Sequence, residues 1–112
     1  MRSQGIDRLC LSFHARLEDL FGEHLKRTIL YGSYTRNEAT EGSDIDIMVL
    51  VDLPRKEIVD YRRAVASIAG DFLLSDGILI SASIENEAFF YAKKDVLPFY
   101  RNILCDGKLI GA

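Results

Sequence analysis

The fold of this chain is decided by two neighbouring segments, Gly32-Ser33-Tyr34-Thr35-Arg36 and Gly42-Ser43-Asp44-Ile45-Asp46-Ile47-Met48-Val49-Leu50. The second segment sets an Asp-x-Asp pair at the start of an apolar run, a pattern that predicts a strand. Because residues i and i+2 of a strand point to the same face, Asp44 and Asp46 project side by side, roughly 6.6 Å apart along the chain. Two carboxylates at this separation repel each other by roughly 3 kcal/mol at an effective dielectric constant of about 20.

A bound cation would relieve this repulsion between the two carboxylates. Hard oxygen ligands of this kind suit Mg²⁺ or Mn²⁺, together with a substrate that carries phosphate groups. We therefore predict that Asp44 and Asp46 form a metal site.

The Gly-Ser pair is expected to hold the phosphates. Residues 25–31 are rich in apolar and β-favouring types, which predicts a strand that runs into Gly32. A glycine lets the backbone approach a ligand closely, and the amide groups that follow it, with the Ser33 hydroxyl, can hold phosphate oxygens. Arg36 adds a planar fork of donors that suits a phosphate. Positioned phosphates, metal ions that bridge them and an in-line hydroxyl are the main requirements of nucleotidyl transfer.

These residues resemble the nucleotidyltransferase superfamily of DNA polymerase beta, and specifically its minimal nucleotidyltransferases. The family pattern is Gly-Ser, a spacer, and Asp-x-Asp, usually with a serine just before the first aspartate. Here the pattern reads Gly32-Ser33, then Ser43, then Asp44-Ile45-Asp46. The likeness extends over nearly the whole chain and implies one domain, residues 1–112, of the α/β (α+β) class. Its fold would be a small mixed sheet of about three or four strands with helices packed on it.

The resemblance also implies a function. The minimal nucleotidyltransferases are typically encoded beside a small helical HEPN-domain protein, act as its antitoxin, and transfer AMP from ATP to a tyrosine hydroxyl of that partner. By this likeness the chain would be a Mg²⁺-dependent nucleotidyltransferase of a toxin–antitoxin pair. Asp44 and Asp46 would be the catalytic, metal-binding residues, Gly32 and Ser33 would hold the ATP triphosphate, and Arg36 would assist.

One departure from the family pattern concerns a third carboxylate, which the family usually carries on the strand beside the Asp-x-Asp strand. The strand expected there, residues 77–84, holds no acid, and Ser81 or Ser83 would take the position. Glu85 lies one step past that strand on the face of the two serines, whereas Asp52 lies roughly 20 Å along the chain from Asp46. The departure keeps a second hypothesis open, a catalytically weakened domain that acts only by binding its partner or nucleotide.

Length, charge and composition limit the classes of protein to which this chain can belong. With 112 residues and a net charge of −3, the chain predicts one domain and argues against general nucleic-acid binding. No stretch approaches the roughly 20 apolar residues that a membrane span needs, and the first residues lack a signal-peptide apolar region. Cys10 and Cys105 match no metal spacing and are expected to be small buried hydrophobes in a reducing cytoplasm. The sequence leaves open whether the protein is a homodimer.

Helical periodicity predicts a first helix that ends at Gly22, a second from Pro54 to about residue 74, and a last one over residues 95–105. A short edge strand is expected at residues 108–110. Five aromatic residues gather near the C-terminus, and they predict either a mini-core that closes the sheet or an exposed patch for a partner protein: Phe89, Phe90, Tyr91, Phe99 and Tyr100.

Overall fold

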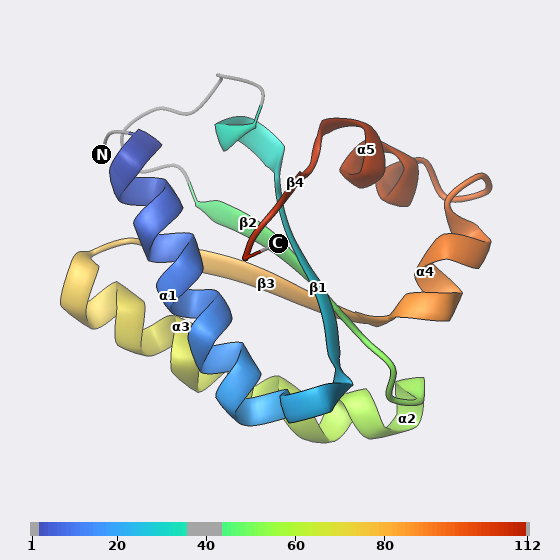
Figure 1. The fold of residues 1–112 in the computed structure, drawn as a ribbon, viewed down its shortest axis with the longest axis horizontal. Helices are drawn as coiled ribbons and strands as arrows, with labels where there is room; N and C mark the ends of the chain where they lie inside the picture. Colours follow the sequence, from blue (N-terminus) through green and yellow to red (C-terminus); the bar gives the residue numbers. More distant parts are fainter. Residues whose placement is uncertain (1–2, 36–43, 112) are drawn as a thin grey trace.

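The computed structural model describes residues 3–35 and 44–111, so the predicted site residue Arg36, and Ser43, lie outside the described residues. The strands form one four-stranded sheet in the order β3-β2-β1-β4 (Figure 1). They are β1 (Leu25–Tyr31), β2 (Ile45–Val51), β3 (Ile80–Asn86) and β4 (Lys108–Leu109). β1 is antiparallel to β2 and β4, whereas β2 and β3 are parallel. This mixed sheet confirms the predicted α/β (α+β) class.

Helices pack on both faces of the sheet, and the alternation of β2 explains why. Its odd-numbered residues are buried against α1 (Ser3–Phe21) and α3 (Arg62–Asp76): Ile45, Ile47, Val49 and Val51. Its even-numbered residues Met48 and Leu50 are buried on the opposite face, with side chains of α4 (Glu87–Lys93) and α5 (Pro98–Asp106). Figure 1 shows α4 and α5 gathered at one end, away from α1 and α3. The predicted alternation is confirmed, and it puts Asp46 on the α4–α5 face.

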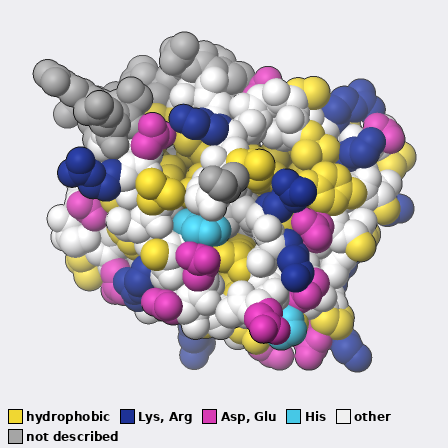
Figure 2. All heavy atoms as spheres, in the orientation of Figure 1, with side chains coloured by type: hydrophobic (Ala, Val, Ile, Leu, Met, Phe, Trp, Pro, Cys, Tyr) yellow, Lys and Arg dark blue, Asp and Glu magenta, His cyan; other side chains and the backbone are white. Residues whose placement is uncertain are grey.

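The C-terminal aromatic residues divide between core and surface. Phe90 is fully buried, and its ring centroid lies 4.8 Å from that of Tyr100, as the mini-core interpretation predicts. Phe99 is half-exposed and meets the ring of Tyr31 edge-on at 5.6 Å. Together with the exposed Val96 and Leu97, it contributes to the apolar surface that Figure 2 shows over α5 and the segment leading into it.

The helix predicted from Pro54 to about residue 74 differs from the observed elements. It consists of α2 (Arg55–Ile58), the short 3-10 helix η3 (Val59–Tyr61) and α3, which continues to Asp76. α3 ends at Gly77, where φ is +70° and the backbone is left-handed. The third strand therefore begins at Ile80 rather than at Gly77, because this glycine closes a helix instead of opening a strand. The strand then extends through Glu85 and Asn86.

The cysteine prediction is correct for one residue and wrong for the other. Cys10 is buried in α1, where burial raises the pKa of its thiol to about 11. Cys105 is exposed, because Ile103 is the α5 residue that packs into the core and a position two residues further along a helix points away. Within the described ranges, no helix combines the length and the apolar character that crossing a membrane requires.

Candidate functional site

The Gly-Ser turn and the Asp-x-Asp pair meet at one end of the sheet. β1 and β2 are antiparallel, so the last residue of β1 lies beside the start of β2, and Tyr31 pairs with Asp46. Gly32 follows at once and begins the 3-10 helix η2 (Gly32–Tyr34). Thr35 closes this turn, because its backbone N–H and its hydroxyl both donate to the Gly32 carbonyl, at 3.1 and 2.8 Å.

Gly32 lies directly against the Asp46 side chain. Its φ is +84°, and a Cβ atom at this position would collide with the Asp46 carboxylate, lying only 3.2 Å from its Cγ atom. The sequence predicted that Gly32 lets the backbone approach a ligand, and this stays a prediction; the structure adds a close approach of Gly32 to a site carboxylate. Glycine is required here for its backbone conformation and for the space that it leaves to Asp46.

The two aspartates differ in their surroundings. Asp44 is exposed and lies just before β2, whereas Asp46 lies within the strand and is partly buried. Among residues 3–35 and 44–111, no group of three or more His, Cys, Asp or Glu side chains is placed to hold a metal ion. Mg²⁺ is commonly held by one or two carboxylates together with substrate phosphates and water. Asp44 and Asp46 therefore fit a Mg²⁺ ion that shares its coordination with a nucleotide.

The neighbouring strand presents hydroxyl groups beside Asp46. In the parallel register, Ser81 pairs with Asp46, Ser83 with Met48 and Glu85 with Leu50. The predicted shared face of Ser81, Ser83 and Glu85 follows from this register. Glu85 is four residues beyond Ser81, roughly 13 Å along the strand. The carboxylate of β3 is thus far from the Asp-x-Asp pair.

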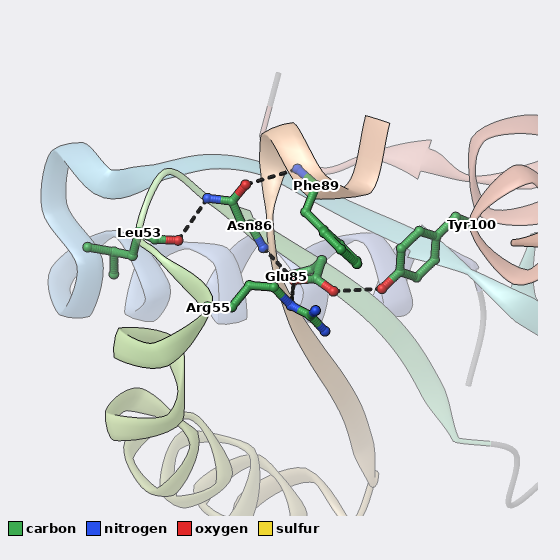
Figure 3. Close-up of polar contacts among 6 residues, drawn as sticks. All are labelled: Leu53, Arg55, Glu85, Asn86, Phe89 and Tyr100. Atoms are coloured by element: carbon green, nitrogen blue, oxygen red, sulfur yellow. Dashed lines mark hydrogen bonds and ion pairs between the residues drawn. The ribbon is translucent and has the colours of Figure 1, made fainter. Parts of the chain in front are cut away.

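Glu85 is held in its own network, which Figure 3 shows. Its Oε1 atom accepts a hydrogen bond from the Tyr100 hydroxyl at 2.7 Å, and its Oε2 atom accepts one from the Asn86 backbone N–H at 2.9 Å. The Arg55 guanidinium lies 3.2 Å from Oε2 and also stacks over the Phe89 ring, 4.0 Å from its centre. The buried carboxylate therefore ties β3 to the start of α2 and to α5.

Tyr31 is a site residue that sequence reasoning missed. Burial raises the pKa of its hydroxyl, the nearby Asp46 charge adds to that shift, and a side-chain hydrogen bond with Ser83 acts in the opposite sense. The ring thus reaches across β2 from β1 to β3, beside the carboxylate. Its place directly before Gly32 was the signal in the sequence that could have identified it.

Comparison with known proteins identifies the family of this chain. A family model described as a nucleotidyltransferase domain matches residues 12–104. The chain belongs to this family. A protein of Methanocaldococcus jannaschii named as a candidate protein adenylyltransferase is 34% identical over 94 residues, which cover 84% of this chain and 86% of the relative. A second protein of that organism with the same name is 31% identical over 111 residues, which cover 98% of this chain and 74% of the relative.

Solved structures share the fold. A chain of a toxin–antitoxin complex with AMP-PNP superposes with a TM-score of 0.56 at 18% identity, over 88% of this chain and 70% of that one. A chain of a complex between a tri-AMPylated Shewanella oneidensis HEPN toxin and its MNT antitoxin gives a TM-score of 0.51 at 18% identity, over 93% and 71% of the two chains. These likenesses agree with the family assignment and confirm the nucleotidyltransferase fold predicted from the Gly-Ser and Asp-x-Asp motifs.

The contact between Gly32 and Asp46 can be tested by adding a single methyl group. Gly32→Ala should lower the free energy of unfolding by about 1–3 kcal/mol more than Gly22→Ala, because overpacking adds to the cost of the left-handed backbone. Gly22 is the matched control, since its φ is +58° and nothing lies within 4 Å of a Cβ atom built there. Urea unfolding of both variants measures the difference, and equal losses would contradict the contact.

The Glu85 network predicts a pH dependence of stability. Desolvation and the neighbouring Glu85 raise the pKa of Tyr100 to about 12, against an ordinary value of 10.0. The stability that the neutral phenol contributes should thus be complete below pH 10 and be lost as the pH rises towards 12. Urea unfolding at pH 9 and pH 11 should show a larger loss in the wild type than in Tyr100→Phe. An equal loss of unfolding free energy in the wild type and in Tyr100→Phe would contradict the raised pKa of Tyr100.

Proposed function

We propose that this chain transfers AMP from ATP, with Mg²⁺ or Mn²⁺, to a hydroxyl group of a partner protein. The contact of Gly32 with Asp46 carries the proposal, because it joins the turn suited to phosphates and the carboxylates suited to a cation in one place. The two relatives named as candidate protein adenylyltransferases, at 34% and 31% identity, support AMP as the transferred group.

Each site residue then has a role. Asp44 and Asp46 would hold the ion, while Gly32 and Ser33 would hold the triphosphate through the turn's backbone amides and the Ser33 hydroxyl. Arg36 would assist at the phosphates. The ion, when bound, neutralises charge that develops on the phosphoryl oxygens. The chain itself orients the nucleotide, so that an incoming hydroxyl can approach the α-phosphate in line with the departing pyrophosphate.

We further propose that the acceptor is a HEPN-domain protein and that this chain is its antitoxin. The complex of a tri-AMPylated HEPN toxin with an MNT antitoxin, which shares this fold, supports that choice. The apolar surface of Val96, Leu97 and Phe99 lies next to the site through the Phe99–Tyr31 contact and is available to such a protein (Figure 2). We place the protein in the cytoplasm, where the unpaired Cys10 and Cys105 would stay reduced.

A second candidate function is binding without transfer. It is favoured by the serine on β3, since Ser81 stands beside Asp46 where the family usually carries a third carboxylate. Such a domain would keep its affinity for the nucleotide or the partner and neutralise the partner through the complex alone.

Mass spectrometry of the partner separates the two candidates. The protein encoded in the neighbouring reading frame, which we expect to be a HEPN-domain protein, is incubated with the chain, ATP and Mg²⁺, and its intact mass is recorded. Transfer predicts a gain of one AMP for each modified hydroxyl, lost in Asp46→Asn because the ion is no longer held. Asp60→Asn is the matched control, since Asp60 is an exposed carboxylate in η3, and it should leave the mass gain unchanged.

Binding without transfer predicts a different result in the same experiment. A tight complex with no mass gain, and full neutralisation of the partner by Asp44→Asn/Asp46→Asn, would replace the transferase with a binding antitoxin.

A further inference from the structure

Strand β3 has an exposed hydroxyl at the position nearest the metal-binding pair. Ser81 pairs with Asp46 in the parallel register, and neighbouring strands lie roughly 4.8 Å apart. A carboxylate at residue 81 would therefore be close enough to Asp46 to share cations with it. A serine hydroxyl is a neutral and much weaker ligand for Mg²⁺ than a carboxylate.

The other polar groups of this face are already engaged elsewhere. Ser83 shares a hydrogen bond with the Tyr31 hydroxyl. Glu85 is only 6% exposed, and its two oxygens are held by Tyr100, Asn86 and Arg55 (Figure 3). Moving Glu85 towards Asp46 would break these three contacts and would leave the Arg55 charge without its carboxylate. The described part of β3 thus offers no anionic ligand at the site.

We infer that this site binds one divalent cation for each nucleotide, and that residue 81 is the position at which a carboxylate would be needed to hold a second cation. The inference rests on the proposed function and specifies its metal requirement. Two divalent cations about 3.5–4 Å apart repel strongly and need bridging anionic ligands. Asp44 and Asp46, together with the nucleotide phosphates, supply ligands for one such ion, and no third carboxylate of the described residues stands beside them to hold a second.

The number of bound ions can be counted by equilibrium dialysis with Mn²⁺ and AMP-PNP. The protein is kept in one compartment, and the excess of Mn²⁺ there is divided by the excess of AMP-PNP. Because unbound Mn²⁺–AMP-PNP equilibrates across the membrane, the ratio reports only the complex with the protein. We expect a ratio of about one for the wild type and about two for Ser81→Asp, which places a carboxylate next to Asp46.

Two further variants complete the experiment. Ser67→Asp adds the same charge on the exposed surface of α3 and should keep the ratio at one. Glu85→Gln should also keep it at one, because Glu85 is a structural group rather than a ligand. Thermal unfolding followed by circular dichroism establishes that each variant is folded before it is dialysed.

Each outcome has a separate meaning. A ratio of two in the wild type would overturn the inference, and a fall to one in Glu85→Gln would then make Glu85 the second ligand. A ratio of one in both the wild type and Ser81→Asp would overturn the role of residue 81. Retention of AMP-PNP without Mn²⁺, or no retention at all, would instead refute the proposed function.

Discussion

The pairing of β1 with β2 is the constraint on which the rest of the site depends. Tyr31 lies opposite Asp46, and the next residue, Gly32, packs its α-carbon against the Asp46 carboxylate. A shift of this register by one residue would turn Asp46 into the α1–α3 core and would separate the turn from the carboxylate. The register is fixed because Ile45 and Ile47 are fully buried on one face, while Met48 is buried on the other.

The sequence predicted the features that local patterns control. Alternation along residues 44–51 predicted which side chains of β2 share a face, and the β-favouring run before Gly32 predicted the bounds of β1. The start of β3 could not be read in the same way, because Gly77 is equally suited to a turn and to a helix end. Gly77 ends a helix because α3 continues far enough to bury Phe72 and its neighbours in the core, and this packing is a tertiary effect. The contact between Gly32 and Asp46 also depends on strand register and was invisible in the sequence.

Glu85 illustrates the same limit in a functional setting. The sequence showed a carboxylate close to the position of a missing ligand and placed it correctly on the serine face. Its partners Arg55 and Tyr100 lie 30 residues before it and 15 residues after it, and no local pattern predicted that they would meet (Figure 3). In this member of the nucleotidyltransferase family, β3 contributes hydroxyl groups to the site and uses its buried carboxylate to anchor the helices around it.

We propose that Asp46, held against Gly32, binds a cation together with a nucleotide. Calorimetric titration of ATP with and without Mg²⁺, in the wild type and in Asp46→Asn, tests it most directly. We expect Mg²⁺ to tighten ATP binding at least about tenfold in the wild type, a gain of roughly 1.4 kcal/mol, and we expect the variant to lose this gain. Equal affinity with and without Mg²⁺ in the wild type, or an undiminished gain in Asp46→Asn, would contradict it.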